Sequence, residues 1–311
     1  MNKLKKIFLT LFLILLIIVV SIGTFSGSLL YNIIIYSNSS KNSIYAEYIY
    51  KATYSNRTWL LRQSNLEDKY VNSFDNLKLH AYSVKQKEKT SKWAIIVHGY
   101  GEDSKLMSIK ALHFYEMGYN VLVPDLRGNG KSEGNYFGMG WNDRLDICKW
   151  IDTIIKEDPN SQISLYGVSM GASSILMASG ENLPSNVKAI VSDCAYTSVY
   201  DVFGYNLKTY LNTPSFPIVN FTDLVTRIKC GYSLKDASAI NQVKKSKIPI
   251  LFIHGSSDKI VPPHMMNDLY NATKCDKEKL LIEYAEHGSA DLVDPEAYWS
   301  KIKIFLNKYI N

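Results

Sequence analysis

The chain has 311 residues, of which 46% are hydrophobic and 21% are charged, proportions that are ordinary for a globular protein. The net charge of +6 is raised by three lysines near the amino end, Lys3, Lys5 and Lys6, so the rest of the chain is nearly balanced. We find no basic stripe interleaved with aromatic residues, which excludes the usual nucleic-acid-binding classes. No Pro-, Ser- or Gly-rich linker and no repeat divides the chain, so we expect one main domain with an N-terminal appendage.

The appendage, residues 1–40, is expected to be a transmembrane anchor. Residues 7–40 contain no Asp, Glu, Lys, Arg or His. The apolar stretch from Ile7 to Leu30 exceeds the roughly 20 helical residues that a bilayer core requires. Because lysines precede it, the amino end should stay in the cytoplasm and the rest of the chain should be exported. These features predict a single-pass protein of the cell membrane with an extracytoplasmic domain.

A cleaved signal peptide, which would give a secreted protein, is the alternative interpretation. "SIGTFSGS", residues 21–28, offers small residues near a plausible cleavage point. The apolar stretch is longer than a usual signal peptide, resumes as "LLYNIII" and has no A-x-A sequence, which favours the uncleaved anchor. The first cysteine is Cys148, so lipid attachment to a cysteine just after the signal is excluded.

Residues 41–75 are polar and Tyr-rich with weak helical periodicity, and we interpret them as a juxtamembrane segment. From residue 76 to residue 311, strands and helices alternate. The expected strands lie within residues 77–84, 92–102, 120–128, 162–169, 187–195, 248–258 and 279–288. The expected helices cover roughly residues 105–118 and 141–157, then begin at Met170, after Pro263 and near residue 295. This order predicts an α/β fold with a mostly parallel central sheet and helices on both faces, with ligands bound beyond the carboxyl ends of the strands.

Residues 197–245 interrupt this alternation. The segment is aromatic, partly helical and longer than a simple crossover. We expect a helical lid inserted over the strand ends, with an ordinary pair of surface helices as the alternative.

The pentapeptide Gly167-Val168-Ser169-Met170-Gly171 lies between a predicted strand and a predicted helix. A tight strand-to-helix turn exposes a serine hydroxyl, and flanking glycines relieve the crowding of the backbone. We therefore predict that Ser169 is a nucleophile and that the backbone amide of Met170 is an oxyanion donor. As the alternative, the glycines only allow a helix to pack closely on a strand, and Ser169 has no catalytic role.

A serine nucleophile needs a base and an acid that orients the base. Among the six histidines, His287 in "AEHGSA" follows the last predicted strand and is our candidate base. The others lie within a strand or helix or at its end: His80, His98, His113, His254 and His264. Asp258 in "HGSSDKIVPP" follows the preceding strand and is the candidate acid, with Asp193 as the alternative.

A second oxyanion donor is expected from the loop His98-Gly99-Tyr100-Gly101, where the amide of Tyr100 is the candidate and His98 orients the loop. "DLRGNGKSEG" is glycine-spaced but fits no phosphate-binding pattern. We interpret its Asp125 and Arg127 as structural.

The cysteines form no C-x-x-C pair and no metal-ligand cluster with histidine, so we expect no zinc or other metal and no organic cofactor. They are scattered, at Cys148, Cys194, Cys230 and Cys275. Cys148 and Cys194 are expected to be buried free thiols.

Together these motifs resemble the ordered sequence blocks of the α/β-hydrolase superfamily. "HGYGE", "DLRGNGKSEG", "YGVSMGA", "HGSSDKIVPP" and "EHG" match over roughly residues 75–310. The chain is most similar to the membrane-anchored bacterial branch described as serine aminopeptidase-like. The resemblance implies a catalytic triad at Ser169, Asp258 and His287, with oxyanion donors at Met170 and Tyr100. Val168 departs from relatives that carry His or Tyr there, but it can still pack under the turn.

The expected activity is serine hydrolysis through an acyl-enzyme, with a small carboxylic ester as the leading substrate. Peptidase or aminopeptidase action on short peptides is the alternative. A non-catalytic, membrane-tethered binding protein with a hydrolase fold is the alternative of a different class.

Overall fold

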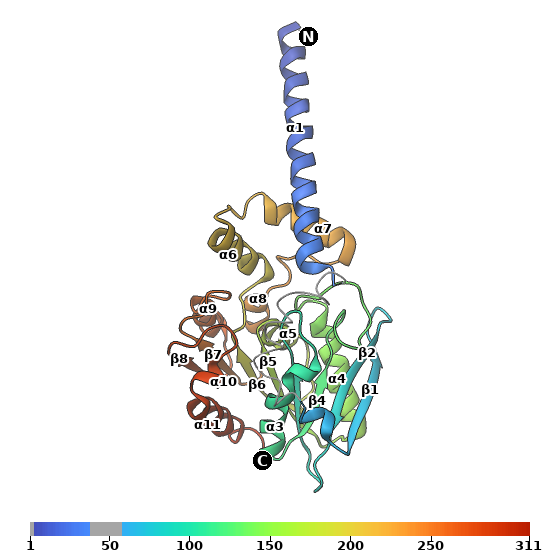
Figure 1. Cartoon of the computed structure of the whole chain (residues 1–311), viewed down its shortest axis with the longest axis vertical. Helices are drawn as coiled ribbons and strands as arrows, with labels where there is room; N and C mark the ends of the chain where they lie inside the picture. Colours follow the sequence, from blue (N-terminus) through green and yellow to red (C-terminus); the bar gives the residue numbers. More distant parts are fainter. Residues whose placement is uncertain (1–2, 38–57) are drawn as a thin grey trace.

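The computed structural model describes residues 3–37 and 58–311 (Figure 1). Its centre is an eight-stranded sheet in the order β1-β2-β4-β3-β5-β6-β7-β8. The strands are β1 (Leu66–Asn72), β2 (Lys78–Val84), β3 (Lys92–Val97), β4 (Asn120–Pro124), β5 (Gln162–Val168), β6 (Val187–Asp193), β7 (Ile250–Gly255) and β8 (Lys277–Ile282). The pairs β1–β2 and β2–β4 are antiparallel and the other pairs are parallel, which confirms the mostly parallel sheet.

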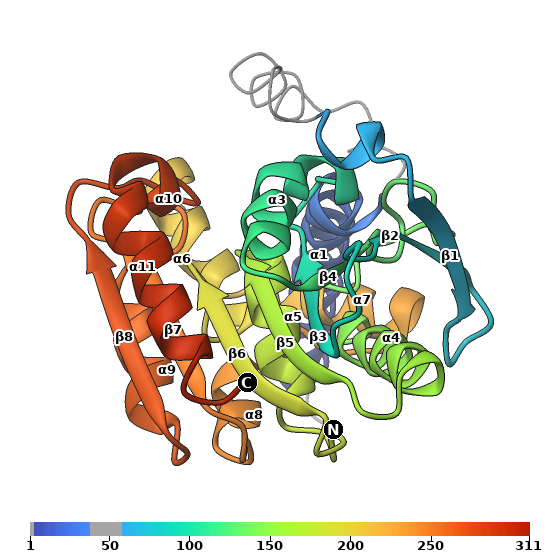
Figure 2. The same cartoon turned by 90° about the horizontal axis from the view of Figure 1, so that it is seen from below.

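Helices cover both faces of the sheet (Figure 2). The longer ones are α3 (Ser108–Glu116), α4 (Asp143–Glu157), α5 (Met170–Ala178), α9 (His264–Ala272) and α11 (Pro295–Leu306), and α10 (Ala290–Val293) is short. One apolar core contains side chains of α4, α5 and α9, and the other contains side chains of α3 and α11. The α/β fold predicted from the alternation of strands and helices is therefore confirmed, as is the helix-covered sheet that the motif resemblance implies.

The start of the sheet corrects one expectation. Residues 66–72 lie in the segment expected to be juxtamembrane with weak helical periodicity, yet they form β1, the edge strand beside β2. A short 3₁₀ helix, Leu60–Arg62, precedes it. The strand was missed because it is half exposed and charged ("LEDKYVN"), and its main-chain pairing with β2 outweighs its weak apolar pattern. The rest of the expected segment, up to residue 57, lies outside the described residues.

The N-terminal helix α1 (Lys3–Leu30) rises out of the domain, followed directly by a π-helical turn, η1 (Tyr31–Ile35) (Figure 1). Residues 3–35 are long and apolar enough to cross a bilayer, and the side chains of residues 3–22 are exposed. The first buried residue of α1 is Gly23, near the end that enters the domain.

Between β6 and β7 the chain inserts α6 (Val199–Leu211), α7 (Ile218–Cys230) and α8 (Ala239–Val243). These helices occupy the region 197–245 that was expected to be an insertion. Figure 1 shows α6 and α7 on the side of the domain from which α1 rises.

Candidate active site

Ser169 occupies the turn between β5 and α5, at the carboxyl edge of the sheet. Its φ of 55° and ψ of −116° place a non-glycine residue in a strained region of backbone space. A Cβ added at Gly171 would lie 2.3 Å from the carbonyl oxygen of Val97, and one at Gly167 would lie 2.5 Å from the carbonyl carbon of Gly171. The two readings of these glycines are thus compatible, because close packing of α5 on the sheet is what forms the turn.

The loops after β7 and β8 bring an acid and an imidazole to this turn. The Nε2 of His287 lies 2.8 Å from the Oγ of Ser169. Its Nδ1 lies 2.7 Å from the Oδ2 of Asp258. The other oxygen of Asp258 accepts hydrogen bonds of 2.9 Å from the backbone N–H groups of Ile260 and Val261. The three candidate residues therefore form one continuous hydrogen-bonded chain.

A second histidine, His254, supports the acid. Its Nε2 lies 3.2 Å from the Oδ2 of Asp258 and 2.8 Å from the carbonyl oxygen of Val261. Burial alone would raise the pKa of the Asp258 carboxyl, but hydrogen bonds from His254 and His287 hold that pKa well below its usual value. From the sequence, His254 was expected only to end a strand. Its spacing of four residues from Asp258 across a turn was the available signal.

Asp193, the alternative acid, has different partners. Its Oδ2 accepts a 2.7 Å hydrogen bond from the hydroxyl of Tyr298, and that hydroxyl lies 2.8 Å from the hydroxyl of Tyr166. Burial raises the pKa of Asp193 to about 6. The carboxyl of Asp193 is therefore part of a buried polar network beside the nucleophile turn.

The candidate oxyanion donors lie on either side of Ser169. Met170 begins α5, and Tyr100 lies in the loop after β3. Within residues 3–37 and 58–311, no internal hydrogen bond takes up the backbone N–H of either residue. His98 fixes the loop, since its Nε2 accepts from the N–H of Leu126 at 3.0 Å and its Nδ1 donates to the carbonyl of Gly99 at 2.7 Å. Both backbone N–H groups are thus without an internal acceptor, and their role as oxyanion donors stays a prediction.

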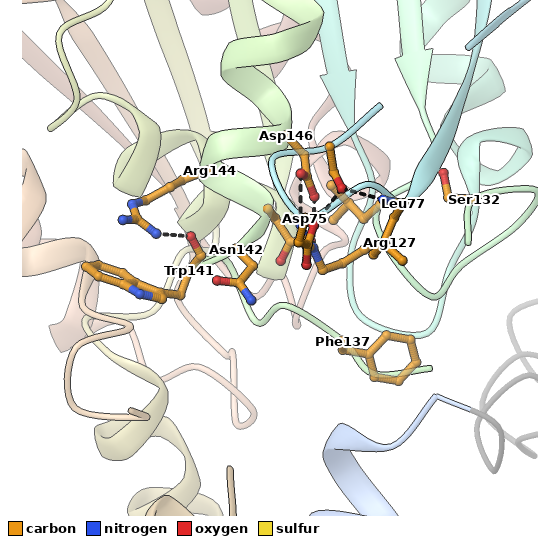
Figure 3. Close-up of polar contacts among 12 residues, drawn as sticks. Asp75, Leu77, Arg127, Ser132, Phe137, Trp141, Asn142, Arg144 and Asp146 are labelled. Carbon is orange, nitrogen blue, oxygen red and sulfur yellow. Dashed lines mark hydrogen bonds and ion pairs between the residues drawn. The ribbon is translucent and has the colours of Figure 1, made fainter. Parts of the chain in front are cut away.

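Arg127, in the "DLRGNGKSEG" loop, is completely buried in an ion-pair cluster (Figure 3). Its guanidinium donates two 2.9 Å hydrogen bonds to the carboxylate of Asp146, and another of 2.9 Å to Asp75. Burial raises the pKa of Asp146 to about 7, an effect that the charge of Arg127 opposes. Asp125 in the same loop accepts from the Nδ1 of His80 at 2.7 Å. These contacts fix the loop and leave no charged group of Arg127 for a ligand.

Sequence reasoning missed the part played by residues 31–37. Tyr31 and Ile35 are buried in the domain core. The hydroxyl of Tyr100 donates a 2.7 Å hydrogen bond to the carbonyl of Ile34, and the N–H of Phe137 donates one of 2.8 Å to the carbonyl of Ile35. The end of the N-terminal helix therefore contacts the same loop that carries a candidate oxyanion donor.

The inserted helix α6 lies against the loop that carries Asp258. The side chain of Asn206 in α6 donates to the carbonyl of Ile260 at 3.1 Å. A cavity of about 470 Å³ lies between α6 and α9, and its lining includes Ser215 and His264 but not Ser169. The cavity is bordered by the insertion and does not contain the candidate nucleophile.

Among residues 3–37 and 58–311, one cluster of a cysteine, a carboxylate and a histidine is compact enough to share a metal ion. It consists of Cys194, Asp258 and His287. Cys194 is buried, and burial raises the pKa of its thiol well above the usual value. His287 and Asp258 are already hydrogen-bonded to each other. The donor set does not fit a metal ion.

Two protein families match this chain. Residues 88–209 match the family described as serine aminopeptidase, S33, and residues 178–288 match the serine hydrolase family FSH1. The uncharacterized protein YqkD of Bacillus subtilis is 27% identical over 68% of this chain and 70% of its own. The uncharacterized membrane protein YNL320W of Saccharomyces cerevisiae is 26% identical over 75% of this chain and 76% of its own.

Among solved structures, the Pyrococcus furiosus esterase Pf2001 superposes with a TM-score of 0.65 at 23% identity. The superposition covers 79% of this chain and 93% of the esterase. The fold and both family matches agree with the sequence motifs. The chain therefore has the α/β-hydrolase fold, and the two partial family matches support an enzyme of the serine hydrolase type.

Proposed function

We propose that this chain is a membrane-anchored carboxylic-ester hydrolase in which Ser169 is the nucleophile, His287 the general base and Asp258 the orienting acid. The observation that carries the proposal is the continuous hydrogen-bonded chain from the Ser169 hydroxyl through His287 to Asp258, with distances of 2.8 Å and 2.7 Å. Because the serine, histidine and aspartate are all present and hydrogen-bonded, this chain of contacts also argues against a non-catalytic binding protein.

In the proposed reaction, the Oγ of Ser169 attacks the ester carbonyl while the Nε2 of His287 takes its proton. The backbone amides of Met170 and Tyr100 stabilise the oxyanion, each by about 3 kcal/mol if comparable with measured donors. His287 then protonates the departing alcohol, which leaves an acyl group on Ser169. A water molecule, deprotonated by His287, attacks the acyl carbonyl and releases the carboxylic acid. Ionised Asp258 holds the imidazole in the tautomer that leaves Nε2 free to accept a proton.

An ester is favoured because it is the more reactive of the two bonds and because the structural neighbour Pf2001 is an esterase. Action on short peptides is the second candidate, since residues 88–209 match a family described as serine aminopeptidase.

For the topology, we propose that α1 spans the cell membrane and that the domain lies outside the cytoplasm. The support is the lysine-led amino end, the exposed apolar surface of α1 and the membrane protein among the relatives. Protease treatment of intact cells tests it, and a domain that is protected from protease contradicts the orientation.

The function is tested with a fluorophosphonate probe on the full chain in detergent. We expect wild type to be labelled and Ser169→Ala to remain unlabelled, whereas equal labelling of both refutes the mechanism. Rates on p-nitrophenyl esters of graded chain length and on aminoacyl-nitroanilides then separate the two substrate classes. Anilide turnover as fast as ester turnover overturns the preference for esters.

A further inference from the structure

The membrane helix α1 packs directly against α7 of the insertion. Gly23 and Gly27 face Phe221, and a Cβ at Gly23 would lie 2.0 Å from the phenyl ring. At Gly27 a Cβ would lie 2.6 Å from the backbone carbonyl carbon of Phe221. Two small residues four apart allow such an approach between helices. The contact therefore fixes the position of α7 relative to the membrane helix.

The length of α1 places this contact at the edge of the bilayer. The three lysines at the amino end belong at the cytoplasmic headgroups, so the hydrocarbon core begins near Ile7. A core about 30 Å thick takes roughly 20 helical residues, which brings its other boundary to about Ser26. Gly23 and Gly27 flank that position. The helix that packs on them, α7, consequently lies at the depth of the membrane interface.

Exposed apolar side chains occur at the end of α6, in the loop before α7 and on α7. We define the lid patch as the four exposed side chains Leu211, Phe216, Leu224 and Ile228. Phe216 and Ile228 are 71% and 75% exposed. Two cations, Arg227 and Lys229, lie exposed on the same helix. An exposed apolar patch with neighbouring cations is the composition of a segment that lies in a membrane interface.

The domain is held against the membrane at this same edge. Tyr31 and Ile35, five and nine residues beyond Ser26, are buried in the core. The hydrogen bond from Tyr100 to Ile34 joins the loop of the candidate oxyanion donor to the end of the anchor. The anchor, the insertion and the site therefore meet on one side of the molecule, as the positions of α1, α6 and α7 in Figure 1 also indicate.

We propose that the lid patch lies in the bilayer interface, so that the enzyme takes its substrate, the acyl ester of a membrane lipid, directly from the bilayer. This inference rests on the proposed ester hydrolysis and adds the source and class of the ester. Ser215, the sequence neighbour of Phe216, lines the cavity between α6 and α9, so the patch borders that cavity. In this arrangement the lid patch is the surface that meets the lipid.

The activity test uses the full chain reconstituted in vesicles of ether-linked phosphatidylcholine, in which the added ester is the only carboxylic ester present. p-Nitrophenyl palmitate serves as the membrane-borne ester and p-nitrophenyl acetate as the water-soluble one. We expect Phe216→Glu with Ile228→Glu to slow palmitate hydrolysis at least about tenfold, because each apolar contact with lipid is lost, and to leave acetate hydrolysis unchanged. The matched control Ile304→Glu, at an exposed residue of α11 distant from α1, should change neither rate.

Equal effects of the lid and control variants on palmitate hydrolysis overturn the inference. Wild type that cleaves neither ester refutes the proposed function instead, so the two failures are distinguishable.

A second measurement does not depend on activity. In vesicles of brominated phosphatidylcholine, the additional tryptophan of Ile228→Trp should be quenched and that of Ile304→Trp should not. An unquenched tryptophan at residue 228, whether it faces water or a second copy of the chain, overturns the inference.

Discussion

Replacing Asp258 by asparagine tests the proposed acid with almost no change of shape. The Oδ1 of Asp258 accepts from the N–H groups of Ile260 and Val261, and an amide oxygen can replace it there. This fixes the orientation of the new side chain, because an amide NH₂ cannot accept those two hydrogen bonds. The NH₂ group therefore takes the position of Oδ2, 2.7 Å from the Nδ1 of His287.

The consequence is the wrong tautomer of the imidazole. Since the amide donates to Nδ1, the ring proton moves to Nε2, the atom that lies 2.8 Å from the Oγ of Ser169. Nε2 can then no longer accept the proton of the serine. We expect kcat to fall about 10⁴-fold, equivalent to about 5 kcal/mol of transition-state stabilisation.

The assay is hydrolysis of p-nitrophenyl acetate by the full chain in detergent, with thermal unfolding as the check on folding. Asp193→Asn is the matched control, because Asp193 receives its hydrogen bond from Tyr298 and an amide oxygen can accept that bond. The control should remain within about threefold of wild type, since nothing in the proposed mechanism uses Asp193. An Asp258→Asn enzyme within tenfold of wild type, or an equal loss in Asp193→Asn, refutes the assignment of the acid.

Three further predictions concern stability and the nucleophile turn. Because the folded-state pKa of Asp193 is raised to about 6 from 3.8, folded protein binds more protons than unfolded protein between these values, and stability falls as pH rises through this range. Urea unfolding should show that Asp193→Asn removes about 3 kcal/mol of this loss between pH 4 and pH 8, and identical pH profiles would contradict it. Gly171→Ala places a Cβ 2.3 Å from the fixed carbonyl of Val97, so it should destabilise the protein by about 1–3 kcal/mol and slow ester hydrolysis about 100-fold; a fully active variant would show that the turn can relax. Arg127→Met leaves the buried Asp146 without its ion pair and should lower the unfolding free energy by about 3–5 kcal/mol, whereas a loss under 1 kcal/mol in urea titration would mean that the cluster is not structural.

The central fold was predictable because its signals are local. Each parallel strand buried on both faces is a short apolar run, and each helix after it has its own periodicity and stop signals. The order of Ser169, Asp258 and His287 along the chain placed them at one sheet edge, where the structure has them hydrogen-bonded. The orientation of His254 toward Asp258 depends on the path of a loop, which no local pattern encodes.

The edge strand β1 and the end of the N-terminal apolar helix were not predicted, for different reasons. β1 is an exposed edge whose pairing is carried by the main chain, so its side chains reveal little. The run Ile33–Ile35 has the composition of a lipid-facing helix, although Ile35 is completely buried against the domain. The Gly23 and Gly27 pair was a usable signal for a helix contact, but it did not identify α7 as the partner.

The burial of Tyr31 and Ile35 means that the anchor and the enzyme are not separable modules. A soluble version that begins after residue 37 would lose two core side chains and the carbonyl that Tyr100 binds, and it should fold poorly or aggregate. Truncation should instead start between Gly27 and Tyr31, with apolar side chains that face outward changed to polar ones. Natural shedding by a protease would meet the same constraint, because a cut beyond residue 37 would leave the helix attached to the domain through these buried contacts.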